Sequence, residues 1–81
     1  MTKILPTDFN KKEIKIGQKI YVAVESRMYK GIVVDIKYET RAGKYLMIPI
    51  IYLRIIKYDR DEERNYSTRR GFNIIIYEDI E

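Results

Sequence analysis

The sequence predicts a small protein of the mainly β class, and three observations indicate this. The chain has 81 residues, enough for one domain with a small core. It contains 15 Ile and 8 Tyr, which favour strands, but only 2 Ala and 3 Leu, which a helical protein would use far more often. Short runs of alternating apolar and polar residues recur between turn signals.

The first part of the chain is expected to precede the sheet. Residues 1–13 contain Pro6 and predict a leader, with a short helical turn over residues 8–13 that Thr7 or Asp8 would cap. Residues 14–81 are then the domain.

Two strands are expected to follow as a hairpin. The first covers residues 19–25, with Tyr21 and Ala23 facing away from the apolar side, and the second covers 28–37. Gly31 indicates a bulge or a close backbone approach inside the second strand. Beyond Gly31, the alternation predicts one shared face for Ile32, Val34 and Ile36.

Three further strands are expected after a charged loop. They cover residues 44–48, 50–58 and 72–77. Pro49 lies between the first two, and because it cannot donate to a ladder it ends a strand or lies at an edge or a bulge. The polar segment 59–71 separates the last two. In the last strand, the inward side chains are predicted to be Phe72, Ile74 and Ile76. Five short, bent strands indicate a single small SH3-like or OB-like barrel.

Composition also excludes several kinds of chemistry. Without Cys or His, the chain has no disulfide framework, no Cys- or His-ligated metal site and no His-based catalytic triad. We therefore expect a protein that is not an enzyme and that uses no cofactor or metal. The N-terminus does not fit a signal peptide, and the longest nearly apolar stretch, residues 45–53, is too short for a membrane-spanning helix. These features predict a cytoplasmic protein with no membrane partner.

Charge is distributed unevenly along the chain. Residues 1–58 carry a net charge of +7 and residues 59–81 a net charge of −3, which together give the overall +4. A basic body favours polyanionic partners through long-range attraction.

The hairpin and the loop after it contain basic and tyrosine residues in alternation. Such a surface suits nucleic acid, because basic groups hold phosphates and aromatic rings stack on unpaired bases. The alternative is an ordinary polar outer face. The predicted nucleic-acid-binding residues are Arg27, Tyr29, Lys30, Lys37, Tyr38, Arg41, Lys44 and Tyr45.

The polar segment 59–71 is a second candidate, because long connections in small domains are often functional. It would contact a protein partner, or Arg69 and Arg70 would bind phosphate. The alternative is a long β-hairpin whose strand extends through Tyr66, Ser67 and Thr68. The predicted partner-binding residues are Arg60, Arg64, Tyr66, Arg69 and Arg70.

Apolar residues occupy both faces of the stretch 45–56, and one small barrel has only one interior. The second face is expected to be covered by Ile4, Leu5 and Phe9, to be exposed, or to be buried in a partner or a homodimer.

The segments Gly17–Val24 and Arg27–Ile36 resemble the opening hairpin of SH3-like small barrels of the Sm, Tudor and KOW type. Position 37 is Lys where the Sm pattern has Asp, and no Asn follows, which departs from a true Sm protein. The hairpin with Ile48–Ile50 also looks like the N-terminal barrel of flagellar-brake proteins. Arg60 and Arg64 are similar to the cyclic-di-GMP motif of their neighbouring domain, but the spacing that follows differs.

Together these features predict a non-enzymatic binding module, with nucleic acid as the leading partner. The alternative is a small phage-type or regulatory protein that binds and modulates a host protein through its Ile-rich face, a free strand edge or the segment 59–71.

Overall fold

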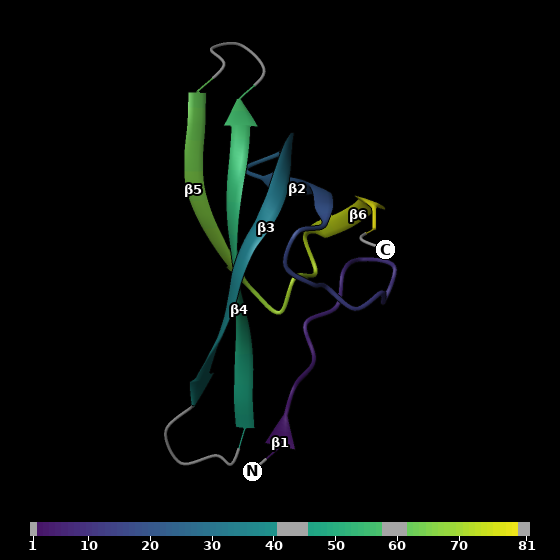
Figure 1. Ribbon diagram of the computed structural model, residues 1–81, viewed down its shortest axis with the longest axis vertical. Helices are drawn as coiled ribbons and strands as arrows, with labels where there is room; N and C mark the ends of the chain where they lie inside the picture. The colour runs from purple at the N-terminus through teal and green to yellow at the C-terminus, as the bar shows by residue number, and fades with distance from the viewer. Residues whose placement is uncertain (1, 41–45, 58–61, 80–81) are drawn as a thin grey trace.

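The computed structural model describes residues 2–40, 46–57 and 62–79, and these residues form a six-stranded sheet curled into a half-barrel (Figure 1). No helix occurs in these three ranges, which confirms the all-β prediction. It follows that none of the described residues belongs to a helix able to cross a membrane. The strands are β1 (Thr2–Lys3), β2 (Lys19–Val24), β3 (Arg27–Thr40), β4 (Leu46–Lys57), β5 (Glu62–Arg69) and β6 (Ile74–Glu78).

The sheet is an antiparallel meander closed at one end by the last strand. Its order is β6-β2-β3-β4-β5, and each neighbouring pair is antiparallel. The short β1 pairs in parallel with the start of β4 and shares with β5 the edge of β4 that β3 does not occupy. β3 and β4 run along the long axis of the molecule, and β2 and β6 cross at one side (Figure 1).

The β2–β3 hairpin has a two-residue turn with an uncommon backbone. Val24 pairs with Arg27, and both turn residues have positive φ, 48° for Glu25 and 67° for Ser26. This is the type I′ geometry, whose twist matches that of the flanking strands. Side chains other than those of Gly, Asn and Asp tolerate this conformation poorly, so the turn is strained.

The strand register shows which of the two roles expected of Gly31, a bulge or a close backbone approach, is the correct one. Gly31 pairs with Ile20 on one side and Ile55 on the other without a shift, so the bulge is not there. A Cβ at this position would lie 2.8 Å from the carbonyl oxygen of Arg54, which makes it a close backbone approach. The bulge lies at Val34 instead, and the predicted common face of Ile32, Val34 and Ile36 is therefore wrong.

The predicted strands 44–48 and 50–58 are one strand in the structure, so the expected break at Pro49 is wrong. The carbonyl of Pro49 accepts a hydrogen bond from Arg70 N at 2.9 Å, so its nitrogen faces the same edge of β4. That nitrogen lies where β1 has ended and the β5 ladder has not begun. Proline is tolerated because no partner there needs its N–H.

The segment 59–71 was expected as a loop or as an extended hairpin, and the structure has the hairpin. β5 covers Tyr66, Ser67 and Thr68 and pairs with β4. The last strand begins at Ile74, so the inward orientation predicted for Phe72 is wrong. Arg70 and Gly71 have φ of 66° and 96°, and the turn that they start leaves Phe72 61% exposed.

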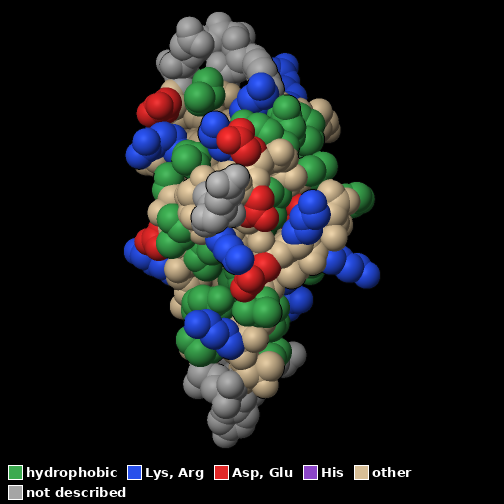
Figure 2. Space-filling model, turned by 45° about the vertical axis from the view of Figure 1, so that its right-hand side comes forward, with side chains coloured by type: hydrophobic (Ala, Val, Ile, Leu, Met, Phe, Trp, Pro, Cys, Tyr) green, Lys and Arg blue, Asp and Glu red, His purple; other side chains and the backbone are tan. Residues whose placement is uncertain are grey.

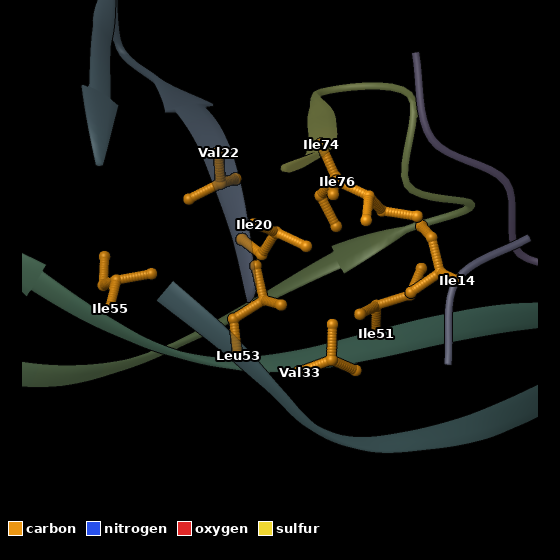
Figure 3. Packing of buried hydrophobic residues seen from close by; sticks show 9 residues of the cluster. All are labelled: Ile14, Ile20, Val22, Val33, Ile51, Leu53, Ile55, Ile74 and Ile76. Atoms are coloured by element: carbon orange, nitrogen blue, oxygen red, sulfur yellow. The ribbon is translucent and has the colours of Figure 1, made fainter. Parts of the chain in front are cut away.

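The core lies on the concave face of the half-barrel. Strands β3 and β4 direct side chains towards those of β2 and β6, and Ile14 from the N-terminal segment completes the cluster (Figure 3). Fully burying each such side chain contributes about 1.5–3 kcal/mol. The buried cluster consists of Ile14, Ile20, Val22, Val33, Ile51, Leu53, Ile55, Ile74 and Ile76.

The N-terminal segment is anchored by a buried carboxylate. Asp8 is 1% exposed, and its Oδ1 accepts hydrogen bonds from Asn10 N at 2.9 Å and Lys12 N at 2.8 Å. Its Oδ2 accepts one from Ile76 N at 3.0 Å, in β6. The helical turn expected over residues 8–13 is not formed, because Lys11 turns the chain with a φ of 63°.

Gln18 anchors the other end of the same segment. Its side chain is fully buried, accepts a hydrogen bond from Lys15 N and donates to Glu13 O and to Asp79 Oδ1. Between these anchors, Phe9 N donates to Ile74 O at 2.7 Å. The outer edge of β6 is therefore occupied by the N-terminal segment.

Replacing Asp8 by Ala is expected to reduce the free energy of unfolding by about 3 kcal/mol or more, because each buried donor left without an acceptor costs about 1–3 kcal/mol. Asp8→Asn should also destabilise, since an amide cannot accept at both ends. Chemical denaturation measures the change. Glu13→Ala, which removes an exposed carboxylate from the same segment, should change stability by less than about 0.5 kcal/mol. Equal effects of Asp8→Ala and Glu13→Ala would contradict the anchoring role.

The strained β2–β3 turn gives a prediction of opposite sign. The double substitution Glu25→Asn and Ser26→Gly should raise the free energy of unfolding by about 1 kcal/mol, because Asn-Gly is the preferred type I′ pair. Thermal unfolding should shift upward by about 4–8 °C. Ser67→Gly, in extended strand β5, is the control and should not stabilise the protein.

Candidate nucleic-acid interface

The convex face of the sheet, opposite the core, gathers tyrosine rings and lysines from four strands. Tyr21 of β2 and Tyr77 of β6 stack with ring centroids 4.5 Å apart and planes tilted by 39°. Lys30 Nζ of β3 lies 5.9 Å from each ring centroid. Both distances lie within the range at which an ammonium group is attracted to an aromatic face.

A second pair of the same kind lies further along the convex face. Lys37 Nζ of β3 is 5.4 Å from the ring centroid of Tyr52 of β4. Seven residues of extended strand separate Lys30 from Lys37, which places the two lysines about 20 Å apart. We call Tyr21, Lys30, Lys37, Tyr52 and Tyr77 the tyrosine–lysine face.

Strand alternation and register bring these side chains to one face. Tyr21 is opposite Lys30 across the β2–β3 ladder, and opposing residues of an antiparallel pair share a face. Tyr52 is opposite Asp35 of β3. The bulge at Val34 sets this register, because it shifts the pairing of β3 by one residue.

Several charges around this face are neutralised within the chain. Ion pairs join Lys19 to Glu78 at 3.3 Å and Arg69 to Glu39 at 3.1 Å, and Arg54 lies 3.9 Å from Glu63. Among the residues that the structure describes, no carboxylate forms an ion pair with Lys30 or Lys37. Lys30 and Lys37 therefore keep their positive charge at the tyrosine rings, although Asp35 lies opposite Tyr52 on the same face. Basic, acidic and apolar side chains are interspersed over the face of the molecule that Figure 2 shows, with no patch of a single sign.

A shallow groove of about 220 Å³ lies beside the stacked pair. It is partly apolar, because Ile32 and Ile56 contribute to its lining and Ile56 is 45% exposed. Its charged lining residues, Lys19, Arg54 and Glu63, all take part in the ion pairs described above. A second hollow of about 300 Å³ borders Tyr52 and Tyr66 on β4 and β5.

The eight residues predicted for nucleic-acid binding are divided between the two faces. Lys30 and Lys37 belong to the tyrosine–lysine face. Tyr29 packs against the core cluster, and Tyr38 lies opposite the buried Pro49 and under Lys3 Nζ, at 4.2 Å from its ring centroid. Arg27 is exposed at the end of the hairpin. The predicted residues Arg41, Lys44 and Tyr45 lie outside the described residues.

The residues predicted to bind a partner through segment 59–71 are also spread over both faces. Arg64 and Tyr66 lie opposite the buried Ile55 and Leu53, on the concave side. Arg69 is on the convex side opposite Ile50, and Arg70 is in the turn after β5. Arg60 lies outside the described residues.

Reasoning from the sequence missed the three tyrosines Tyr21, Tyr52 and Tyr77 as candidate binding residues. The alternation in β2 placed Tyr21 away from the core, and the structure confirms that orientation. The alternation in β4 likewise puts Tyr52 opposite to the side of the buried Ile51 and Leu53. The signal that could have found them was this shared face. Proximity of aromatic and basic residues along the chain does not reveal it.

Comparisons of the chain with models of protein families, with curated proteins and with solved structures found no match. Within the described ranges, no group of three or more Asp, Glu, His or Cys side chains could hold a metal ion.

Proposed function

We propose that the protein is a non-enzymatic module that binds single-stranded nucleic acid on the tyrosine–lysine face. The observation that carries this proposal is the pairing of Tyr21 and Tyr77 with Lys30, and of Tyr52 with Lys37. Each pair combines a ring on which a base can stack with an ammonium group for the adjoining phosphate. An unpaired strand suits this chemistry because its bases are free to stack.

The strand order supports a finer description of the fold. A four-strand meander whose first strand pairs with the last, antiparallel one resembles the SH3-like barrels better than the OB fold. The long β3 with its bulge and the tight turn before β6 agree with that description. We take the protein to be an SH3-like half-barrel, a fold that serves many unrelated functions and does not by itself favour nucleic acid.

Binding on this face would combine two contributions. Stacking on each tyrosine is worth about 1–3 kcal/mol, and it tolerates any base because every base has a π-face. The lysines add charge attraction that weakens with salt. Since neither contribution reads base edges, the proposed module has weak sequence preference.

Salt dependence and substitution provide the test. With both lysines contacting phosphates, the affinity for a labelled single-stranded oligonucleotide should fall at least about sevenfold between about 50 and 200 mM salt. Lys30→Ala should weaken binding to all sequences and lower the slope of the logarithmic salt dependence by about 0.7. Lys12→Ala, in the exposed N-terminal segment, removes the same charge elsewhere and should leave the slope nearly unchanged.

Tyrosine substitutions separate stacking from charge. Tyr52→Ala and Tyr77→Ala should each weaken binding by about five- to a hundredfold with little change in salt slope, whereas Tyr77→Phe should retain most of the affinity. Fluorescence anisotropy measures both quantities. Absence of binding to single-stranded DNA and RNA at about 50 mM salt would overturn the proposal.

A protein partner is the second candidate, and the apolar groove favours it. Ile56 and Met28 are both 45% exposed on the convex face, and Ile32 lines the groove together with Ile56. A partner that seats an apolar side chain in this groove would bind with little salt dependence. Ile56→Gln should abolish such binding while leaving oligonucleotide affinity within a few-fold, because it adds no charge opposite Lys30.

A further inference from the structure

We propose that β5 pairs with β5 of a second copy of the chain, in an antiparallel register centred on Tyr66, and so joins two half-barrels into one continuous sheet. This proposal is independent of the proposed nucleic-acid binding. It rests on the open edge of β5 and on the order of its residues.

The two edges of the meander differ in how they are protected. At β6, Asp8 Oδ2 accepts a hydrogen bond from Ile76 N, and Phe9 N donates one to Ile74 O. A further strand therefore cannot pair there. Along β5, the described residues form a ladder only with β4. β5 forms the boundary of the molecule on that side (Figure 1). It is eight residues long and contains no proline and no register shift, two features that commonly block edge pairing. Four of its residues are charged, so a partner strand must match those charges.

One hydrogen bond fixes which backbone groups of β5 point outward. Arg70 N donates to Pro49 O, so residue 70 faces β4. The register along β5 has no shift, so residues 68, 66 and 64 face β4 as well. The outward N–H and C=O groups therefore belong to Glu63, Asn65, Ser67 and Arg69.

A register centred on Tyr66 pairs these outward residues with one another. Glu63 then lies opposite Arg69 of the second copy, and Asn65 lies opposite Ser67. By two-fold symmetry the same pairs recur in reverse. Each Asn65–Ser67 pair exchanges two hydrogen bonds, and at each end Arg69 N donates to Glu63 O, because Arg69 O already accepts from Gly71 N at 2.8 Å.

The side chains in this register are self-complementary. A carboxylate faces a guanidinium at both ends, and both side chains are 64% exposed. In the dimer, Glu63 and Arg69 would exchange their exposed pairs with Arg54 and Glu39 for each other. An amide faces a hydroxyl next to them, and the two Tyr66 residues form a non-hydrogen-bonded pair at the two-fold axis, with each ring packed against its own core cluster. A shift by two residues in either direction removes the pairing of Glu63 with Arg69. Because β5 is complementary to an antiparallel copy of itself, a second copy of the chain is favoured over a strand of another protein.

Cysteine cross-linking tests the register directly, because the natural chain has no cysteine. Tyr66→Cys should form a disulfide-linked dimer, since opposing Cα atoms at the axis lie about 4.5 Å apart, within the range of a disulfide. An equimolar mixture of Asn65→Cys and Ser67→Cys should cross-link across the pair, and either variant alone should cross-link far less. Glu78→Cys on β6 is the matched control and should remain monomeric under the same oxidation.

Reversible association tests the edge without cross-links. Sedimentation of the natural chain should show a monomer–dimer equilibrium. Ser67→Pro removes an outward N–H without touching the β4 ladder and should raise the dimer dissociation constant at least about tenfold. Glu63→Arg alone and Arg69→Glu alone should weaken the dimer, and the double variant should restore it. Glu78→Arg makes the same charge change away from the edge and should have no effect.

The outcomes separate the possibilities clearly. A chain that stays monomeric at all concentrations, or a dimer that survives Ser67→Pro and responds instead to Ile56→Glu on the convex face, would overturn the proposal. If Ser67→Pro fails to fold, the charge-swap series decides, because all its substitutions are at exposed side chains. Rescue by the double swap would support β5 pairing, and absence of rescue would contradict it.

Discussion

The buried carboxylate of Asp8 is the contact on which the remaining structure depends. It accepts hydrogen bonds from its own turn and from a strand 68 residues further along the chain. A carboxylate loses its hydration when it is buried, so it is stable there only because backbone donors replace the water. In this position it fixes the N-terminal segment, which brings Ile14 into the core and covers the edge of β6. Without that cover, both edges of the meander would be open.

A half-barrel built in this way has two faces with different tasks. The concave face holds the Ile-rich core, and the N-terminal segment covers its β6 side. The convex face has no covering layer among the described residues, yet it contains many of the surplus apolar and aromatic side chains. Leu5 and Phe9, expected to cover the second face, are instead 59% and 71% exposed. The surplus of Ile and Tyr is therefore divided between an interior and a surface rather than hidden in one core.

Local regularity determined which parts of the fold could be predicted. The first hairpin and the faces of Tyr21 and Tyr52 follow from strict alternation, which one strand reveals by itself. The strand was expected to break at Pro49, but proline is tolerated inside a strand where its nitrogen faces no hydrogen-bonding partner. Only the order of strands in the sheet shows that this condition holds here. β5 could not be recognised as a strand from the sequence alone. It is an exposed edge strand, and the polar residues of such strands are also typical of loops. The candidate site was only half predictable for the same reason, since its members meet across the sheet rather than along the chain.

The link between Asp8 and β6 also has a consequence for how the chain acquires its structure. β2 lies in the middle of the sheet, yet its second neighbour, β6, is the last strand of the described chain. During synthesis, the β2–β5 meander would exist before Ile74 and Ile76 are available to close the core. The N-terminal segment would already pair with β4 through β1, but Asp8 and Phe9 would lack their partners in β6 until then. Such non-local pairing is typical of slow folding, in milliseconds to seconds rather than microseconds. Folding of this protein is therefore expected to be completed only after Ile76 has been added, with an unprotected β2 edge until that moment.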